Sequence, residues 1–204
     1  FMFESGEVGR QIAKGSLKWR TFLENVAKHQ KFVLFYQPLV SLIDNRVIHH
    51  EILAKVRDED GQLINAKIFL PMARKAGVSV EVDKTILLQT FQLITQQLNI
   101  QGQSHQQTVE HRSLNLSVES MLSVEFHNFF FDLIEQEKQM LTFLSLEISE
   151  YQLVAHLTEL KPFLDGLKLR NVGLLVDKVG QYVVSAKYLD SYPFTGIKLH
   201  RSIV

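Results

Sequence analysis

The sequence predicts an α/β fold with a parallel sheet, of the kind that closes into a (β/α) barrel. From residue 113 onward, short apolar strands alternate with helix-length amphipathic segments, a pattern typical of parallel strands joined by crossover helices. Polar side chains stand at the ends of these strands, where a barrel gathers its functional residues on one face. With 204 residues, of which 46% are hydrophobic, the chain is long enough for one substantial core.

The composition narrows the classes of function. Lys plus Arg and Asp plus Glu both number 22, so no overall charge favours nucleic acid, and we expect no direct nucleic-acid binding. The lack of cysteine excludes disulfides, thiolate zinc sites and cysteine nucleophiles, and it fits a cytoplasmic location. No apolar run of about 18 residues exists and the N-terminal sequence is no signal peptide, so a membrane anchor is expected only outside this segment.

The first part of the chain is predicted to form a lead-in helix. Ser16 is the expected N-cap, and apolar side chains at helical spacing predict a helix over 17–28. We therefore assign residues 1–30 to a linker and lead-in helix, and residues 31–204 to the domain itself.

The elements of the domain follow from periodicity and turn signals. A strand at 32–36 is expected to stop at Gln37-Pro38 and to form a hairpin with a second strand at 46–55. The polar stretch 101–107 is expected to be a solvated loop. The other predicted elements are helices at 66–76, 81–98, 124–138, 152–169 and 183–190, and strands at 113–117, 143–147, 172–177 and 196–199.

Four oxygen-bearing side chains and one lysine stand at the predicted strand ends. They are Glu51, Asn115, Glu147, Asp177 and Lys198. Oxygen ligands of this kind suit Mg²⁺ or Mn²⁺, so the set is typical of a metal site. The residue after Asp177 is Lys178, however, and an ammonium beside the carboxylates opposes a bound cation.

These residues lie in motifs that resemble the EAL domain of cyclic di-GMP phosphodiesterases, and the resemblance runs over nearly the whole chain. The motifs, in the family's order, are YQPLV at 36–40, EILAK at 51–55, FLPMA at 69–73, NLS at 115–117, LEISE at 146–150, DKVG at 177–180 and KLHR at 198–201. Their number and order make the resemblance specific, since each motif alone is short. The resemblance implies a TIM-like (β/α) barrel of the EAL type.

The resemblance also assigns roles to the strand-end residues. In active members, the positions matching Glu51, Asn115, Glu147 and Asp177 hold two metal ions that activate water, and the lysine matching Lys198 helps to position that water. The family's next aspartate, in D-D-F-G, shares this work, and here it is replaced by Lys178. We expect the carboxylates to form a polar cluster held by hydrogen bonds and by Lys198 or Lys178, with the Lys178 ammonium in an ion pair where a second metal ion would otherwise lie.

Other departures agree with a degenerate site. Lys55 replaces an arginine that contacts a substrate phosphate in the family, and lysine cannot form arginine's bidentate fork. The segment 181–184 replaces the family's T-G-Y-S loop, and His200 replaces an aspartate. The expectation is therefore no catalytic residue, no metal and no cofactor, with the strand-end residues, Lys178 among them, as vestiges. Gln37 and Lys55 are the vestigial ligand-binding positions.

The family's barrel has two further β/α units after the strand that matches K-x-D-R. This chain ends at Val204, so we expect the last two β/α units to be missing from it, either absent or unobserved.

A closer resemblance is to the degenerate EAL domain of the CsrD/MshH regulatory family. It rests on Lys18–Thr21, His49-His50 and Lys198–His200. That family is membrane-anchored, binds the glucose-specific enzyme IIA of the phosphotransferase system, and promotes RNase E-dependent decay of small regulatory RNAs. The resemblance implies a cytoplasmic domain of an inner-membrane-anchored bacterial protein. Two alternatives remain: a receptor that binds cyclic di-GMP without hydrolysis, or a residual one-metal phosphodiesterase.

Some single residues have simpler expected roles. His49 and His50 should point to opposite faces of their strand, because neighbouring side chains alternate. Glu150 is expected to be an N-cap or a first-turn helix residue. The phenylalanines between 126 and 131 are expected mainly in the core, whereas the apolar loop 182–184 at the barrel mouth is a candidate partner surface.

Overall fold

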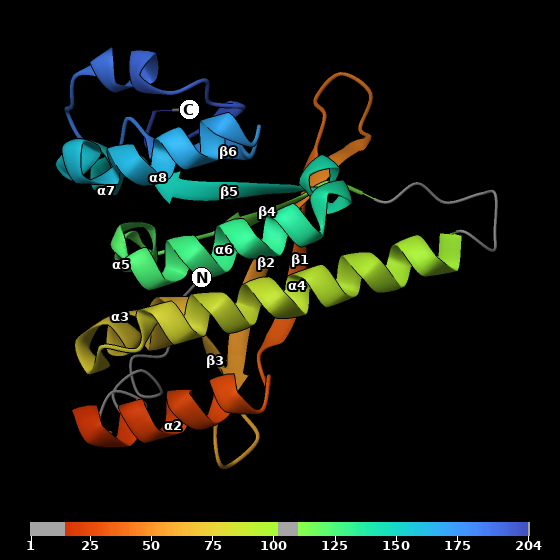
Figure 1. Ribbon diagram of the computed structural model, residues 1–204, viewed down its shortest axis with the longest axis vertical. Coiled ribbons are helices and arrows are strands. Elements are labelled where there is room, and N and C mark those ends of the chain that lie inside the picture. The colour runs from red at the N-terminus through yellow and green to blue at the C-terminus, as the bar shows by residue number, and fades with distance from the viewer. Residues whose placement is uncertain (1–14, 102–109, 204) are drawn as a thin grey trace.

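The computed structural model describes residues 15–101 and 110–203, which form one curled, mostly parallel sheet with helices packed on its outer face (Figure 1). The strands are β1 (Val33–Val40), β2 (Val47–Arg57), β3 (Leu63–Asn65), β4 (Arg112–Asn115), β5 (Leu144–Ser149), β6 (Gly173–Val179) and β7 (Gly196–Leu199). The α-helices are α2 (Ser16–Lys28), α3 (Ala66–Ala76), α4 (Ser79–Gln101), α5 (Val118–Leu122), α6 (Val124–Gln136), α7 (Glu150–Ala155) and α8 (Leu157–Leu169), with 3-10 turns η1 (Lys138–Thr142) and η2 (Ala186–Ser191).

The sheet order is β1-β2-β4-β5-β6-β7, with β3 paired to β2. Strands β2, β4, β5, β6 and β7 run parallel, whereas β1 and β3 are antiparallel to β2. This confirms the predicted α/β fold, and the curled sheet is a half-barrel version of the TIM-like architecture.

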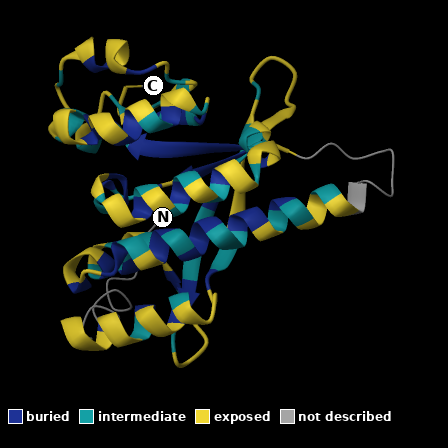
Figure 2. Ribbon diagram, in the orientation of Figure 1, coloured by how far each residue is buried: buried dark blue, intermediate teal, exposed yellow. Residues whose placement is uncertain are grey.

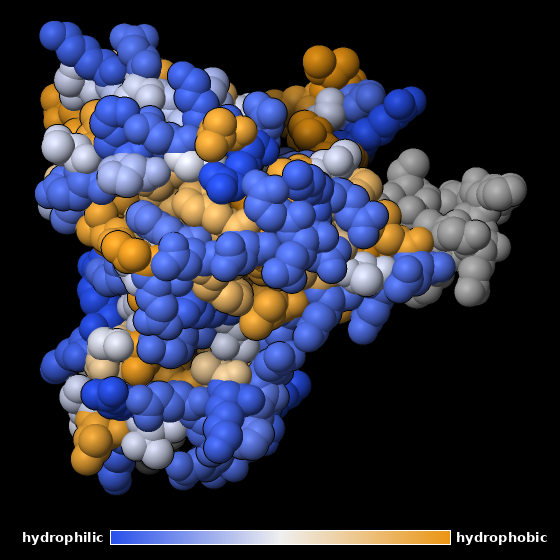
Figure 3. Space-filling view, viewed as in Figure 1, coloured by the Kyte–Doolittle hydropathy of each residue, from blue (hydrophilic) through white to orange (hydrophobic). Residues whose placement is uncertain are grey.

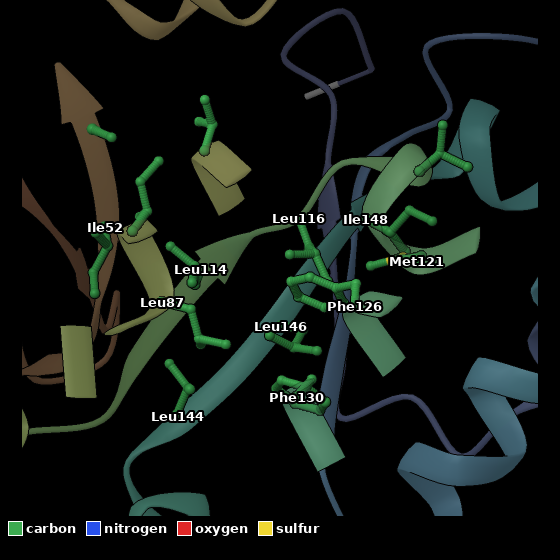
Figure 4. Close-up of a cluster of buried hydrophobic side chains, with 14 of the residues drawn as sticks. Ile52, Leu87, Leu114, Leu116, Met121, Phe126, Phe130, Leu144, Leu146 and Ile148 are labelled. Atoms are coloured by element: carbon green, nitrogen blue, oxygen red, sulfur yellow. The ribbon is translucent and has the colours of Figure 1, made fainter. Parts of the chain in front are cut away.

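The core lies between the sheet and the helices on its outer face. Because strand side chains alternate, Ile52, Leu114 and Leu146 point from neighbouring strands into the helix layer. There they meet Leu87 of α4 and Phe126 of α6, as Figure 4 shows, and Figure 2 shows the buried strands behind partly exposed helices. The phenylalanines of α6 therefore belong mainly to the core, as predicted.

Several predicted boundaries are wrong. Strand β1 does not stop at Pro38 but continues to Val40, since β1 is an edge strand and proline's missing N–H costs it no ladder bond on the open side. The predicted helix 152–169 is two helices, α7 and α8, separated at His156. The segment 183–190 forms only the short η2 turn.

Two further expectations concern the ends of helices. Gly15, not Ser16, is the N-cap of α2, and Ser16 is the first helical residue. Apart from Gln101, which ends α4, the expected loop at 101–107 lies outside the described residues.

The β1–β2 turn has a hydrogen-bonded backbone and exposed apolar side chains. Ser41 bonds to Arg46 through its backbone N–H (2.8 Å), and its hydroxyl accepts the N–H of Ile43 (3.2 Å). The side chains of Leu42 and Ile43 are 99% and 98% exposed, and Figure 3 shows hydrophobic atoms at this tip, at the upper right.

Candidate functional site

The strand-end residues predicted from the sequence gather on the concave face of the sheet. Glu51, Asn115, Glu147 and Lys198 alternate with residues that point into the helix layer, so they face the opposite side. Only Asn115 is the last residue of its strand, and the others lie within theirs. The curl of the sheet, more than the strand ends themselves, brings these side chains together.

Lys198 is the centre of this group. Its Nζ donates to Glu51 Oε2 and to Glu147 Oε2, the latter at 2.8 Å. Asn115 Nδ2 donates to the other oxygen of Glu51 at 2.7 Å. The two carboxylates are thus held by one ammonium, and Glu147 Oε1 is buried with no hydrogen-bond partner in the described part of the chain.

Burial and ion pairing act against each other in this cluster. Burial raises the pKa of Glu147 above its ordinary range, and the hydrogen bond from Lys198 offsets only part of that rise. Burial alone lowers the pKa of Lys198, but its hydrogen bonds to Glu147 and Glu51 outweigh burial, so the net shift is upward. Lys198 is paired and charged, because two carboxylates contact the same ammonium.

Asp83 supports the loop that follows Asn115, although the sequence did not single it out. Its Oδ2 accepts the backbone N–H of Ser117 at 3.0 Å and the hydroxyl of Ser120 at 2.6 Å. Asp83 is 4% exposed. The sequence contained two signs of this role. Asp83 is a carboxylate among the apolar residues of α4, and Ser117 is a typical N-cap residue just before α5.

The segment after Asp177 turns sharply. Lys178 and Gly180 both have left-handed backbones, with φ of 58° and 81°. For lysine this conformation costs on the order of 1 kcal/mol, because its Cβ crowds the backbone. Such strain is typical of functional or formerly functional turns.

Lys178 does not form the ion pairs predicted for it. Its side chain is exposed, and no carboxylate lies within 4 Å of its Nζ among the residues that the structure describes. Instead, Lys178 lines a cavity of about 410 Å³ together with Asp177, Glu147 and Asn115. The prediction failed because Lys198, from the neighbouring strand, already pairs with the carboxylates.

Glu150 does more than the predicted first-turn role. It is the first residue of α7, as expected, but it is also 4% exposed. Its Oε2 accepts the Gly180 N–H at 2.8 Å, and its Oε1 accepts the Tyr188 hydroxyl at 2.7 Å. Glu150 therefore holds the loop that begins at Lys178 in place.

The two residues assigned to ligand binding lie on the hairpin. Gln37 is exposed on β1, opposite Glu51 in the strand register. Lys55 Nζ lies 4.2 Å from the centre of the Phe35 ring, in a cation–π contact. They share one face of the β1–β2 pair with Glu51.

The two histidines before Glu51 point apart, as predicted. His49 contacts the ring of His111, at 5.9 Å between centroids, whereas His50 forms an ion-pair contact with Glu110 at 2.9 Å. Burial lowers the pKa of His49, and nearby Lys198 lowers it further.

The donor set does not fit a two-metal centre. Glu51 and Glu147 are bound to Lys198, and the position beside Asp177 carries a lysine. Over 15–101 and 110–203, no three His, Asp or Glu side chains are placed to hold one ion. The partnerless Oε1 of Glu147 is one suitable donor, but a single oxygen does not hold two ions.

The family follows from comparison with known proteins. The model of the EAL domain matches residues 19–204. The chain belongs to the EAL domain family. The solved EAL-containing structure of Vibrio cholerae LapD (S helix-GGDEF-EAL, apo) aligns with a TM-score of 0.79 at 19% identity, covering 92% of this chain and 43% of that one, which supports the fold.

Curated EAL relatives include both a regulator and enzymes. The RNase E specificity factor CsrD of Escherichia coli is 22% identical over 192 residues, covering 94% of this chain and 28% of CsrD. The probable cyclic di-GMP phosphodiesterase PdeB of E. coli is 23% identical over 182 residues, covering 89% of this chain and 34% of PdeB. This EAL chain thus spans about a third or less of the length of these relatives.

No helix in the described ranges is both long enough and apolar enough to cross a membrane.

Proposed function

We propose that this EAL domain is catalytically inactive and works as a protein-binding regulatory module of the CsrD/MshH kind. The observation that carries the proposal is Lys178, an exposed lysine in the same cavity as Asp177, Glu147 and Asn115. At this position an ammonium replaces the carboxylate that active members supply. A second divalent ion would therefore lose one ligand and share the cavity with a cation, which disfavours its binding.

The neighbouring residues support the same proposal. Lys198 offsets one of the two negative charges of Glu51 and Glu147, but active members carry a matching lysine, so the departures that support inactivity are Lys178 and Lys55. Lys55 contacts Phe35, and it lacks the planar fork with which an arginine would hold a phosphate.

The expected partners come from the similarity to CsrD. We propose that the domain binds glucose-specific enzyme IIA and promotes RNase E-dependent decay of small regulatory RNAs, as a cytoplasmic part of a membrane-anchored protein. The name of the relative, an RNase E specificity factor, supports the proposed role in RNase E-dependent decay.

A cyclic di-GMP receptor without activity is the second candidate. Gln37 favours it, because this residue is retained and exposed beside Glu51. The lysine at position 55 counts against it. A residual phosphodiesterase using one metal ion is the third.

Calorimetry and a turnover assay separate these candidates. The protein is titrated with enzyme IIA, and separately with cyclic di-GMP in the presence of Mn²⁺, while linearised product is followed by chromatography. The proposal expects heat only with enzyme IIA. Micromolar binding of cyclic di-GMP without product would favour the receptor, and turnover that disappears in Asp177→Asn would establish the phosphodiesterase.

A further inference from the structure

A second cavity, of about 370 Å³, adjoins the one that holds the strand-end carboxylates. We call it the Lys178 pocket. Its lining residues are Arg74, Ser149, Tyr151, Gln152, His156, Lys178, Gln181 and Tyr182. The two cavities share Arg74, Ser149, Gln152 and Lys178, so the side chain of Lys178 stands at their boundary.

The charges of the two cavities differ. The carboxylates of Asp83, Glu119, Glu147 and Asp177 line only the first cavity. In the Lys178 pocket, the fully charged lining residues are Arg74 and Lys178, both cationic, and no carboxylate lines it. An anion is therefore attracted to the Lys178 pocket and repelled from its neighbour.

Both cations have bonding capacity left. Lys178 has no carboxylate within 4 Å in the described part of the chain. Arg74 pairs with Glu119 through Nε at 2.5 Å, and its side chain is half-exposed. Its two terminal nitrogens remain to donate to a further acceptor, since a guanidinium carries five N–H groups.

An aromatic wall completes the pocket. The rings of Tyr151 and Tyr182 lie 5.2 Å apart between centroids, and both side chains are more than half exposed. Val183, the next residue, is fully exposed. Exposed tyrosines beside cations are typical of protein interfaces, where they supply contact area at a low cost in side-chain entropy.

A hydrogen bond connects the loop that carries Tyr182 to the helix that carries Tyr151. Glu150 accepts the N–H of Gly180, which fixes the loop between Lys178 and Tyr182 against α7, the helix that carries Tyr151. This hydrogen bond limits the movement of the loop beside the pocket, which lowers the entropy lost on binding.

We propose that the Lys178 pocket is the docking site for an acidic segment of a protein partner. Carboxylates of the partner bind Lys178 and the terminal nitrogens of Arg74, and an apolar side chain beside them packs on Tyr151 and Tyr182. Charge complementarity selects this occupant, because the pocket offers aromatic surface, the unpaired cation Lys178 and the terminal nitrogens of Arg74, and the Glu119 carboxylate that pairs with Arg74 Nε lies outside its lining. The inference rests on the proposed protein-binding function and names the surface and partner chemistry.

The direct test is NMR titration of the protein with the peptide acetyl-Glu-Glu-Phe-Glu-Glu-amide. We expect saturable amide shifts at Tyr151, Gln152, Gln181 and Tyr182. Lys178→Glu should weaken the affinity about tenfold or more, because a cation becomes an anion. Lys187→Glu, a matched reversal on an exposed lysine outside the pocket, should change affinity less than about twofold.

The outcomes separate the pocket from the wider function. Shifts that are absent from the four pocket residues, or equally weakened by both variants, overturn the proposal; unchanged spectra elsewhere show that the variants fold. A parallel titration with enzyme IIA tests the proposed function independently. If enzyme IIA binds elsewhere and Lys178→Glu binds it normally, the protein-binding function stands and the pocket assignment is wrong. If the peptide binds but enzyme IIA does not, the pocket stands and that partner is wrong.

Discussion

At the scale of single residues, burial decides the ionisation of Asp83. Removal from water raises its pKa from 3.8 to about 6, although Ser117 and Ser120 donate hydrogen bonds that favour the charged form. Because the pKa in the folded state lies above the unfolded value, protonated Asp83 stabilises the fold at low pH. This contribution is complete below about pH 4 and is lost as the pH rises through about 6.

The first prediction follows from this loss of stability with rising pH. The free energy of unfolding of the wild type should fall by on the order of 3 kcal/mol between about pH 4 and about pH 7.5, relative to Asp83→Asn, which does not titrate. Urea denaturation across this range measures it. The histidines with lowered pKa values, His49 and His111, titrate in both proteins and cancel in the comparison. Parallel stability curves for the two proteins would show that Asp83 has an ordinary pKa.

Lys178 gives the second prediction. Lys178→Asp should restore the aspartate pair but give no measurable linearisation of cyclic di-GMP with Mn²⁺, because Lys55 and the segment 181–184 remain unlike the active family. Chromatography of the reaction measures it, and Lys187→Asp serves as the matched control. Product formed by Lys178→Asp alone would mean that the single lysine had blocked an otherwise competent site.

The sequence predicted which residues form the site better than how they pair. Motif order identified Glu51, Asn115, Glu147 and Lys198, which the fold brings together. It left open whether Lys198 or Lys178 holds the carboxylates and wrongly expected an ion pair for Lys178, because a chain position shows that a lysine is near a carboxylate and does not show which way it points. The direction follows from the left-handed backbone at residue 178, which depends on the whole loop.

At the scale of elements, periodicity located the long helices and the parallel strands. The predicted helix 66–76 has the same ends as α3. Periodicity did not detect β3 and α5, because these elements are too short to show a repeating pattern. It joined α7 to α8 because apolar spacing continues across His156, while the break depends on tertiary packing.

The contact between α6 and α8 gives the third prediction. A Cβ on Gly166 would lie 2.3 Å from the Phe131 ring, although alanine is the better helix former. Gly166→Ala should therefore destabilise the protein, by about 1–3 kcal/mol in urea denaturation, because the ring must move.

Two controls accompany this variant. Lys168→Ala, at an exposed position of the same helix, should change stability by less than about 0.5 kcal/mol. In a protein that already carries Phe131→Leu, Gly166→Ala should lower the free energy of unfolding by less than it does in the wild type. If Gly166→Ala stabilises the wild type, helix propensity outweighs the steric contact.

At the scale of the whole molecule, the sheet has two edges within the described ranges. β1 pairs only with β2, and β7 pairs only with β6. Ile197 and Leu199 of β7 are about half exposed, at 47% and 54%. An apolar edge strand is a template for pairing with another chain.

The fourth prediction concerns residues 1–204 prepared on their own, and it is self-association through β7. Sedimentation velocity of this chain should show a weight-average sedimentation coefficient that rises with concentration, and Leu199→Lys should reduce that rise by placing a charge on the edge. Leu169→Lys, on an exposed residue at the end of α8, is the control and should behave as the wild type. Equal association of all three proteins would place the contact elsewhere.

The β1–β2 turn has a practical consequence. Its backbone polar groups are bonded within the turn, and the side chains of Leu42 and Ile43 reach solvent without packing on the core. The protein has no cysteine, so Leu42→Cys would provide a unique thiol. A fluorophore attached there would lie at the amino-terminal end of β2, while Asn115 ends β4 at the other end of the parallel strands. A label at this position therefore leaves the Lys178 pocket free for a partner.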